Sequence, residues 1–177
     1  RDMAIPSIAA SLGDSLPMID GREATPDKDS EIAALFHTAG ATGNAKAVPV
    51  THRAILSIMS SILELIPSID EDDVILNAIP NYHSFGFVIG NMLPLAFGMP
   101  QVTLSSFMPP KTTLSTIRGS GVTIIPAVPL MLNILLDGDR NSPPLTRIKL
   151  VFCGGGRPTE ALRERTENFF GVKILEG

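Results

Sequence analysis

Short apolar runs alternate with segments of helical length along most of this 177-residue chain. The apolar runs that predict strands cover residues 32–37, 74–79, 101–105, 122–126, 148–153 and 172–176. Each of the last five follows a segment of helical length, and parallel strands need such a crossover between them. The pattern therefore predicts an α/β fold with a mostly parallel sheet flanked by helices.

Helix start and stop signals support this alternation. Thr51 is a good N-cap for a helix that runs to Ile66, just before Pro67. A last helix is expected with Pro158 near its first turn and Gly171 just past its end, where glycine accepts a left-handed backbone. Three further helices are predicted at residues 85–97, 110–119 and 129–137.

Residues 1–30 carry scattered proline, glycine and aspartate without a sustained period. We interpret them as a loop-rich lead-in with a short strand near residues 16–19, followed by one domain over residues 31–177. The chain starts at an arginine and stops inside a predicted strand. Both ends favour a fragment of a longer parent protein.

Composition excludes several classes of protein. Hydrophobic residues make up 44% of the chain, which excludes disorder, and the net charge of -4 without a basic cluster argues against a nucleic acid polymer as partner. The longest apolar run, residues 85–98, is broken by Asn91 and Pro94 and is too short for a transmembrane segment. One cysteine and no secretory leader favour a cytoplasmic protein, with any membrane association left to other parts of the parent.

The sequence argues against a metal site and against a cysteine nucleophile. The acidic run from Asp70 to Asp73 lies just before a predicted strand and far from any histidine, so we interpret it as a solvated turn and assign no metal ligand in the chain. Cys153 has no histidine near it in the sequence, which argues against a nucleophile.

The stretch from His37 to Ala47 is a run of small residues that ends near one lysine. Glycines allow close backbone approach to an anion, hydroxyl groups can donate to its oxygens, and a lysine adds positive charge. Residues of these types are Thr38, Gly40, Thr42, Gly43 and Lys46. The stretch predicts a phosphate-binding loop, with a plain hairpin turn as the alternative.

Three further motifs follow this loop in order. Thr51-His52-Arg53 comes first, Pro80, His83 and Gly86 form a Pro-x-x-His-x-x-Gly segment, and Gly154-Gly155-Gly156 ends a strand. Over residues 31–177 the chain resembles the adenylate-forming (AMP-binding) superfamily of acyl-CoA synthetases, luciferases and peptide synthetase adenylation domains. The residues around His83 and the segment Ile174-Leu-Glu-Gly177 are most similar to the fatty acyl branch, which includes acyl-carrier-protein synthetases.

The resemblance implies part of an ATP-dependent ligase, truncated before the family's Tyr-Gly-x-Thr-Glu motif. In that family a fatty acid attacks Mg-ATP to give an acyl-adenylate, and a thiol of CoA or acyl carrier protein then takes the acyl group. The residue that coordinates Mg2+ would lie beyond Gly177, so the fragment alone should be inactive. The alternative is a catalytically inactive nucleotide- or acyl-binding module from a degenerate homologue.

The resemblance also assigns roles to residues. The loop residues given above would hold the pyrophosphate end of ATP, and a second set would approach the adenine: Gly154, Gly155, Gly156, Glu176 and Gly177. His83 would lie beside the carboxylate as the catalytic residue. Phe85, Gly86 and Gly90 would border the acyl channel.

Each role has a simpler alternative that the sequence leaves open. Lys46 could be a solvated hairpin lysine, the three glycines a tight strand-to-helix turn, Phe85 a core residue and Gly90 a site of close helix packing. The loop also departs from the family, because alanines replace two hydroxyl residues, a proline and a glycine at Ala39, Ala41, Ala45 and Ala47. Each lost hydrogen bond to a charged oxygen could cost about 1.5–3 kcal/mol.

Overall fold

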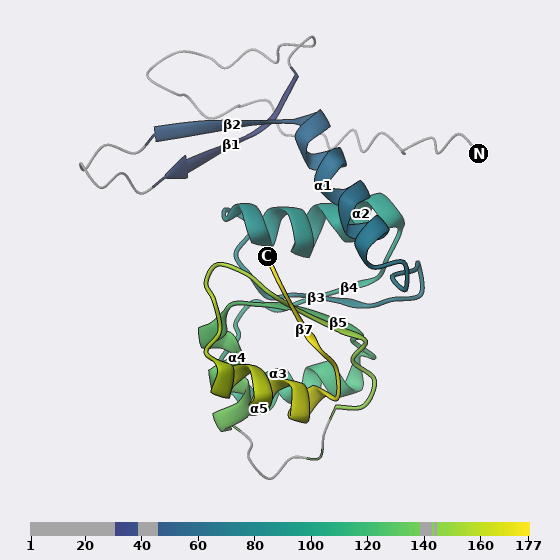
Figure 1. Cartoon of the computed structure of the whole chain (residues 1–177), viewed down its shortest axis with the longest axis vertical. Coiled ribbons are helices and arrows are strands. Elements are labelled where there is room, and N and C mark those ends of the chain that lie inside the picture. The colour runs from purple at the N-terminus through teal and green to yellow at the C-terminus, as the bar shows by residue number, and fades with distance from the viewer. Residues whose placement is uncertain (1–30, 39–45, 139–142, 144) are drawn as a thin grey trace.

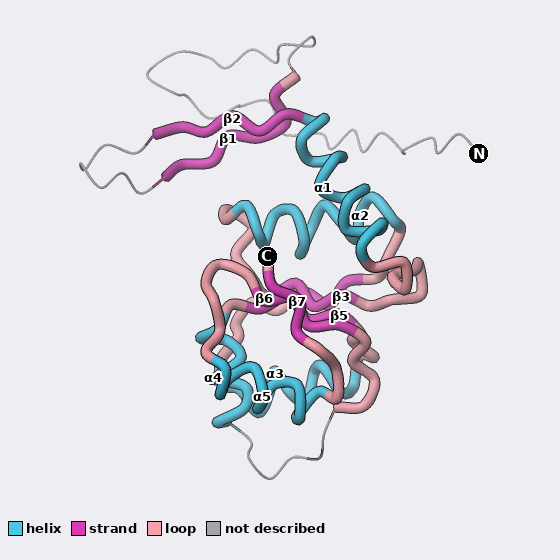
Figure 2. The backbone as a smooth tube through the Cα atoms, in the orientation of Figure 1, coloured by secondary structure: helices cyan, strands magenta, loops and turns pink. Residues whose placement is uncertain are grey.

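The computed structural model describes residues 31–38, 46–138, 143 and 145–177. A sheet lies between two layers of helices, with α1 and α2 on one face and α3, α4 and α5 on the other (Figures 1 and 2). This confirms the predicted α/β class with a parallel sheet flanked by helices. The lead-in over residues 1–30, with its expected strand near 16–19, lies outside the described residues.

The central sheet confirms the last five predicted strands, each shorter than its apolar run. All neighbours are parallel, in the order β4-β3-β5-β6-β7. The strands are β3 (Ile75–Asn77), β4 (Gln101–Thr103), β5 (Ile124–Ala127), β6 (Leu150–Cys153) and β7 (Ile174–Glu176). The chain steps from β3 to β4 in one direction and then passes back across β3 to β5, so the strand order reverses beside β3.

This reversal explains the two helix layers. Crossovers between parallel strands are right-handed, so crossovers that run in opposite directions lie on opposite faces of the sheet. The step from β3 to β4 carries η1 (Gly86–Met92) and α2 (Leu93–Phe97). The later steps carry α3 (Pro110–Gly119), α4 (Pro129–Gly138) and α5 (Glu160–Phe170).

The first predicted strand is real but does not belong to the central sheet. β1 (Ile32–Thr38) pairs antiparallel with β2 (Lys46–Thr51), a strand that the apolar pattern did not predict. Most of β2 is exposed, and it contains Pro49, so it lacks the buried apolar signal of a core strand. The ring of Phe36 on β1 meets the ring of Phe87 on η1 at 5.5 Å between centroids, which fastens the hairpin to the helix layer.

Helix α1 (His52–Leu65) begins where the sequence predicted. The side-chain oxygen of Thr51 accepts a hydrogen bond from the backbone N–H of Ala54 at 3.1 Å, which confirms its N-cap role. At α5 the N-cap is Thr159, so Pro158 lies just before the helix and not in its first turn. Gly171 ends α5 at φ 71°, as predicted.

The segment predicted as one helix at 85–97 forms a π-helix, η1, followed by the short helix α2. The N–H of Leu93 bonds to the carbonyl of Val88, five residues earlier, as a π-helix requires. Pro94 follows and has no N–H to give to the carbonyl four residues before it, which weakens the α-helical pattern here. None of the helices that the structure describes is both long and apolar enough to cross a membrane.

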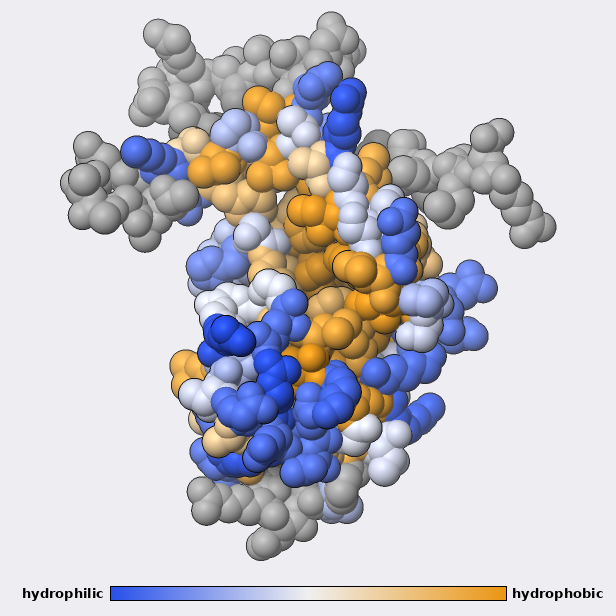
Figure 3. All heavy atoms as spheres, in the orientation of Figure 1, coloured by the Kyte–Doolittle hydropathy of each residue, from blue (hydrophilic) through white to orange (hydrophobic). Residues whose placement is uncertain are grey.

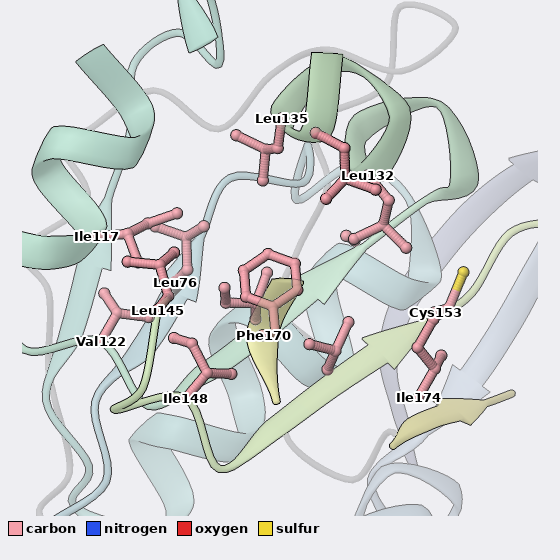
Figure 4. Packing of buried hydrophobic residues seen from close by; sticks show 14 of the residues in the cluster. Leu76, Ile117, Val122, Leu132, Leu135, Leu145, Ile148, Cys153, Phe170 and Ile174 are labelled. Carbon is pink, nitrogen blue, oxygen red and sulfur yellow. The ribbon is translucent and has the colours of Figure 1, made fainter. Parts of the chain in front are cut away.

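Successive residues of the strands point to opposite faces of the sheet and pack into two different hydrophobic cores. Ile75, Ile124 and Leu150 pack toward α1, η1 and α2, whereas their successors Leu76, Ile125 and Val151 pack toward α3, α4 and α5. Figure 4 shows the second core, with Phe170 of α5 lying among residues from the strands and the other helices. Figure 3 shows apolar surface over the hairpin and α1 side of the molecule, and a concentration of hydrophilic residues over α5.

The acidic run at Asp70–Asp73 is not wholly solvated as predicted. Asp73 is only 1% exposed, accepts a hydrogen bond from Thr123 Oγ1 at 2.7 Å and pairs with Lys149 Nζ at 2.9 Å. These partners precede β5 and β6, so the carboxylate ties together the amino ends of three strands. Burial alone would raise the pKa of Asp73, but the hydrogen bonds from Thr123 and Lys149 lower it overall.

Candidate functional site

Several of the site residues predicted from the sequence lie at the carboxyl edge of the central sheet. His83 and Phe85 follow β3, the three glycines follow β6, and Gly177 follows β7. Open parallel sheets bind ligands outside this edge, beside the point where the strand order reverses. The reversal next to β3 places His83 at that point.

His83 lies against the β1–β2 hairpin. A groove of about 440 Å³ separates the two and is lined by Ala34, Leu35, Phe36, His37, Asn81, Tyr82, His83 and Phe87. A second groove of about 270 Å³ also contains His83, together with Val48 and Val50 of β2. The rings of Tyr82 and His83 pack at 4.6 Å between centroids, and both residues are exposed to a ligand in these grooves.

The hairpin carries the small-residue loop. Thr38 and Lys46 are paired across the two strands, so residues 39–45, which lie outside the described residues, connect β1 to β2. That connection does not exclude anion binding, because a phosphate loop can also join two strands. Gly40, Thr42 and Gly43 lie outside the described residues, whereas Lys46 is exposed at the start of β2.

Phe85 contacts the glycine turn directly. A Cβ atom placed on Gly154 would lie 2.9 Å from Cζ of Phe85 and 3.0 Å from Cε1 and Cε2, so the end of the ring lies on this backbone. The N–H of Gly154 donates to the carbonyl of Ala127 at 3.1 Å. The loops after β3 and β6 therefore meet across the end of β5.

The other two glycines leave backbone accessible. Gly155 has φ 71°, a conformation that favours glycine, and a Cβ there would approach Val128 Cγ1 at 3.2 Å. Gly156 is exposed, and a Cβ there would meet only Pro129, at 3.7 Å. The segment is thus a tight strand-to-helix turn whose backbone is also open to a flat ligand.

Gly86 and Gly90 are buried where η1 packs on the end of β3. A Cβ on Gly86 would lie 2.5 Å from the carbonyl oxygen of Pro80, and one on Gly90 would lie 3.1 Å from Oδ1 of Asn77. Both glycines therefore have a packing role, as the alternative for Gly90 anticipated. Neither is among the residues that line the two grooves beside His83.

Glu176 points away from the His83 side of the sheet. It lies two residues after Ile174, which packs in the core beneath α5, and its carboxylate pairs with Arg163 of α5. Gly177 donates its N–H to the carbonyl of Cys153 at 3.2 Å, so its backbone runs beside the glycine turn. The backbone of Gly177 therefore lies where it could meet a ligand on that turn.

The sequence reasoning assigned no role to His37, Tyr82 or Arg163. For His37 and Tyr82 the sequence did contain a signal of a place in the site, because His37 begins the small-residue loop and Tyr82 precedes His83. Burial raises the pKa of the Cys153 thiol, which opposes the thiolate that a nucleophile needs. Within the described part of the chain, no three His, Cys, Asp or Glu side chains gather to hold a metal ion.

Comparison with known proteins identifies the family of the chain. The family model described as AMP-binding enzyme matches residues 5–177. A 4-coumarate–CoA ligase-like protein of Oryza sativa is 30% identical over 82% of this chain and 26% of its own length. A Rhodococcus jostii ligase, 3-[(3aS,4S,7aS)-7a-methyl-1,5-dioxo-octahydro-1H-inden-4-yl]propanoyl:CoA ligase, is 28% identical over 91% of this chain and 31% of its own length.

Among solved structures, O-succinylbenzoate coenzyme A synthetase of Bacillus subtilis, in complex with ATP and magnesium, superposes with a TM-score of 0.69. It is 27% identical, and the match covers 81% of this chain and 29% of that enzyme. The chain thus spans less than a third of the length of each of these three proteins.

Proposed function

The chain belongs to the AMP-binding enzyme family, and we propose that it is part of an ATP-dependent ligase that activates a carboxylic acid. One oxygen of the acid attacks the α-phosphorus of ATP, and the bond from that phosphorus to the leaving pyrophosphate breaks. The resulting acyl-adenylate then reacts at its carbonyl carbon with a thiol, which forms a thioester and releases AMP.

The contact between Phe85 and Gly154 is the observation that carries this proposal. It joins two motifs that are far apart in the sequence, at the sheet edge where a ligand is expected. The grooves beside His83 add the β1–β2 hairpin to the same edge. Acid, phosphates and adenine could therefore bind side by side.

The backbone of the glycine turn fits a nucleotide base. Gly155 and Gly156 are exposed, and the space beside Gly156 is open to a planar ring. We propose that the adenine lies against this turn and near the backbone of Gly177. Thr38, Gly40, Thr42, Gly43 and Lys46 would hold the pyrophosphate end, and the charge of Lys46 would stabilise the negative charge that develops there.

We assign no Mg2+ ligand to this chain. The described residues contain no group of acidic or histidine side chains that fits the ion. When bound to ATP, Mg2+ would neutralise charge on the phosphates, as in other phosphoryl-transfer enzymes. We expect its coordinating residue beyond Gly177.

His83 is proposed to orient the carboxylate of the acid. Its ring is exposed in both grooves at the point of strand reversal, so it can donate a hydrogen bond to a carboxylate oxygen. Holding that oxygen in line with the α-phosphorus would lower the entropic cost of the attack.

We propose a fatty or other hydrophobic acid as substrate. Phe152 packs with the core on the α1, η1 and α2 side, and Leu175 lies opposite it in the sheet register, so both apolar side chains share the face that carries Phe85. Gly86 and Gly90 would let η1 approach the end of β3 and so limit the depth of the acyl channel. The polar groups of a polar acid would lose water at such a surface without gaining hydrogen-bond partners.

The acyl acceptor is proposed to be CoA, which the names of the ligases above give, with acyl carrier protein as the other candidate. The chain would then act in fatty acid metabolism in the cytoplasm. Both acceptors present the same type of thiol, so a comparison of free CoA with a loaded carrier protein separates them.

A catalytically inactive binding module is the second candidate. The observation that favours it is the set of alanines in the phosphate loop, Ala39, Ala41, Ala45 and Ala47. A module of this kind would bind ATP or acid without forming an adenylate.

The test uses the full-length protein with ATP, Mg2+ and a series of acids, and measures thioester formation. We expect a product with hydrophobic acids, and a large loss of rate in His83→Ala at unchanged stability. His52→Ala, on exposed surface at the start of α1, is the control. ATP binding without any adenylate or thioester would instead identify the inactive module.

A further inference from the structure

We propose that Arg163 is a positioning residue, which holds the glycine turn at residues 154–156 in place through its ion pair with Glu176. Its effect on ATP rests on the function proposed above. Its effect on the turn itself does not depend on that function.

The ion pair joins α5, the helix after the turn, to β7, the strand that pairs with β6 before the turn. Arg163 lies on α5, which begins shortly after the turn, and its guanidinium contacts the carboxylate of Glu176 at the end of β7. Arg157, directly after Gly156, also reaches Glu176, with 3.8 Å from its Nε to Oε2. The carboxylate thus lies between two arginines that flank the amino end of α5.

The pair between Arg163 and Glu176 is the stronger of the two. Their side chains are 25% and 29% exposed, whereas Arg157 is 87% exposed, and exposed pairs contribute little because water and salt screen them. Glu160 also approaches Nε of Arg163, at 3.5 Å, but its side chain is 77% exposed, so this pair contributes little.

The turn has few contacts of its own. Its residues carry no side chains. Gly154 is held by Phe85 on one side and by its N–H bond to Ala127 on the other, whereas Gly155 lies close only to Val128 Cγ1 and Gly156 only to Pro129. Gly155 and Gly156 are exposed, and glycine has the largest backbone freedom of any residue. The position of these two residues therefore depends on what fixes the segments on both sides.

Arg163 connects α5, after the turn, to β6, before the turn, by way of β7. β7 is held to β6 by the sheet and by the bond from the N–H of Gly177 to the carbonyl of Cys153. Because Arg163 holds α5 to Glu176 on β7, the strand before the turn and the helix after it are both attached to β7. A turn that is already ordered loses less entropy when it binds a base.

The experiment measures two properties of the full-length protein in Arg163→Met, Arg163→Lys and Arg165→Met. Arg165 lies on the same helix and pairs with Asp137 at 2.7 Å, away from the turn. Arg165→Met therefore makes the same chemical change and removes one ion pair, whereas Arg163→Met removes the pairs with Glu176 and Glu160. The first property is amide hydrogen exchange in peptides that contain residues 154–157 and Gly177. The second is the set of steady-state constants for ATP and for the acid.

We expect faster exchange at the turn in Arg163→Met than in Arg165→Met. The KM for ATP should rise about threefold to tenfold in Arg163→Met, with kcat and the KM for the acid changed by less than about twofold. Arg163→Lys should recover part of the ATP affinity, since it keeps the charge. Equal thermal midpoints for the two methionine variants would exclude a general loss of stability as the cause.

Exchange at the turn that is the same in Arg163→Met and Arg165→Met would overturn the proposal. So would an equal rise in the KM values for ATP and acid. If the wild-type protein forms no adenylate, the proposed function fails, and hydrogen exchange alone then decides the role of Arg163.

Discussion

The ring of Phe85 lies on the backbone of Gly154, close enough that a methyl group at position 154 would come within 2.9 Å of Cζ. Phe85 was expected beside the acid and Gly154 beside the adenine. Because the two residues are in contact, a substitution at one position should displace the residue at the other.

Gly154→Ala should therefore push the Phe85 ring out of its position. We expect the free energy of unfolding to fall by about 1–3 kcal/mol, the usual cost of an overpacked contact. Gly156→Ala is the control, because a Cβ there meets only an ordinary contact with Pro129 at 3.7 Å. Chemical denaturation of both variants, of Phe85→Ala and of Phe85→Ala/Gly154→Ala measures the effect, and the cycle should show a clear coupling energy between positions 85 and 154. Equal losses at positions 154 and 156 would contradict the contact.

Asp73→Asn should weaken the amino ends of the strands and alter the pH dependence of stability. The folded-state pKa of Asp73 is lowered from 3.8, so its ionised form contributes stability that is complete above pH 3.8 and is lost as the pH falls through the lower, folded value. We expect a loss of about 2 kcal/mol near neutral pH, since Thr123 and Lys149 lose a charged partner.

The measurement for Asp73 is the free energy of unfolding between about pH 2 and about pH 7, at steps of roughly one pH unit. The variant should show a weaker decline at acid pH than the wild type. Asp72→Asn is the matched control, because Asp72 is exposed in the same turn. A variant whose stability follows the wild-type curve would show that the buried pair contributes nothing.

Much of the fold could be predicted because its signals are local. Each strand of a buried parallel sheet is a short apolar run, and the intervening helices carry their own start and stop residues, such as Thr51 and Gly171. β2 escaped prediction because it is exposed and contains Pro49. The burial of Asp73 depends on Thr123, 50 residues away, and no pattern within the acidic run reveals such a partner.

The candidate site was predictable to a similar degree. Motif order placed His83 and the glycine turn at strand ends, and the parallel sheet then brings those ends to one edge. The ring of Phe85 on Gly154 is a contact between distant segments, which spacing alone does not give. The direction of Glu176 follows from its alternation with Ile174, a signal that was present in the sequence but needs the face of β7 to be known.

Lys46→Ala in the full-length protein should affect ATP and not the acid. Loss of a charged hydrogen bond costs about 1.5–3 kcal/mol, so the KM for ATP should rise by roughly tenfold or more. Lys111→Ala, which removes an exposed lysine from α3 on the opposite side of the sheet, is the control. Calorimetric ATP affinity equal in both variants would make Lys46 a solvated hairpin residue.

Ala41→Thr should have the opposite effect on ATP. The substitution supplies a hydroxyl donor at a loop position where the family resemblance implies one, so we expect tighter ATP binding by about 1 kcal/mol or more. Selectivity among acids should stay the same. Kinetics at several ATP concentrations provide the measurement, and an unchanged affinity would mean that backbone N–H groups already satisfy the phosphate oxygens.

The most direct measurement is ATP–pyrophosphate exchange, because it reports adenylate formation without any thiol acceptor. In the full-length protein we predict exchange that depends on a hydrophobic acid. Residues 1–177 alone should show none, since most of the electrostatic stabilisation of the transferred group is expected from residues beyond Gly177. The full-length protein without acid-dependent exchange, or the isolated chain with exchange above a heat-inactivated control, would contradict a ligase whose active site is completed outside this chain.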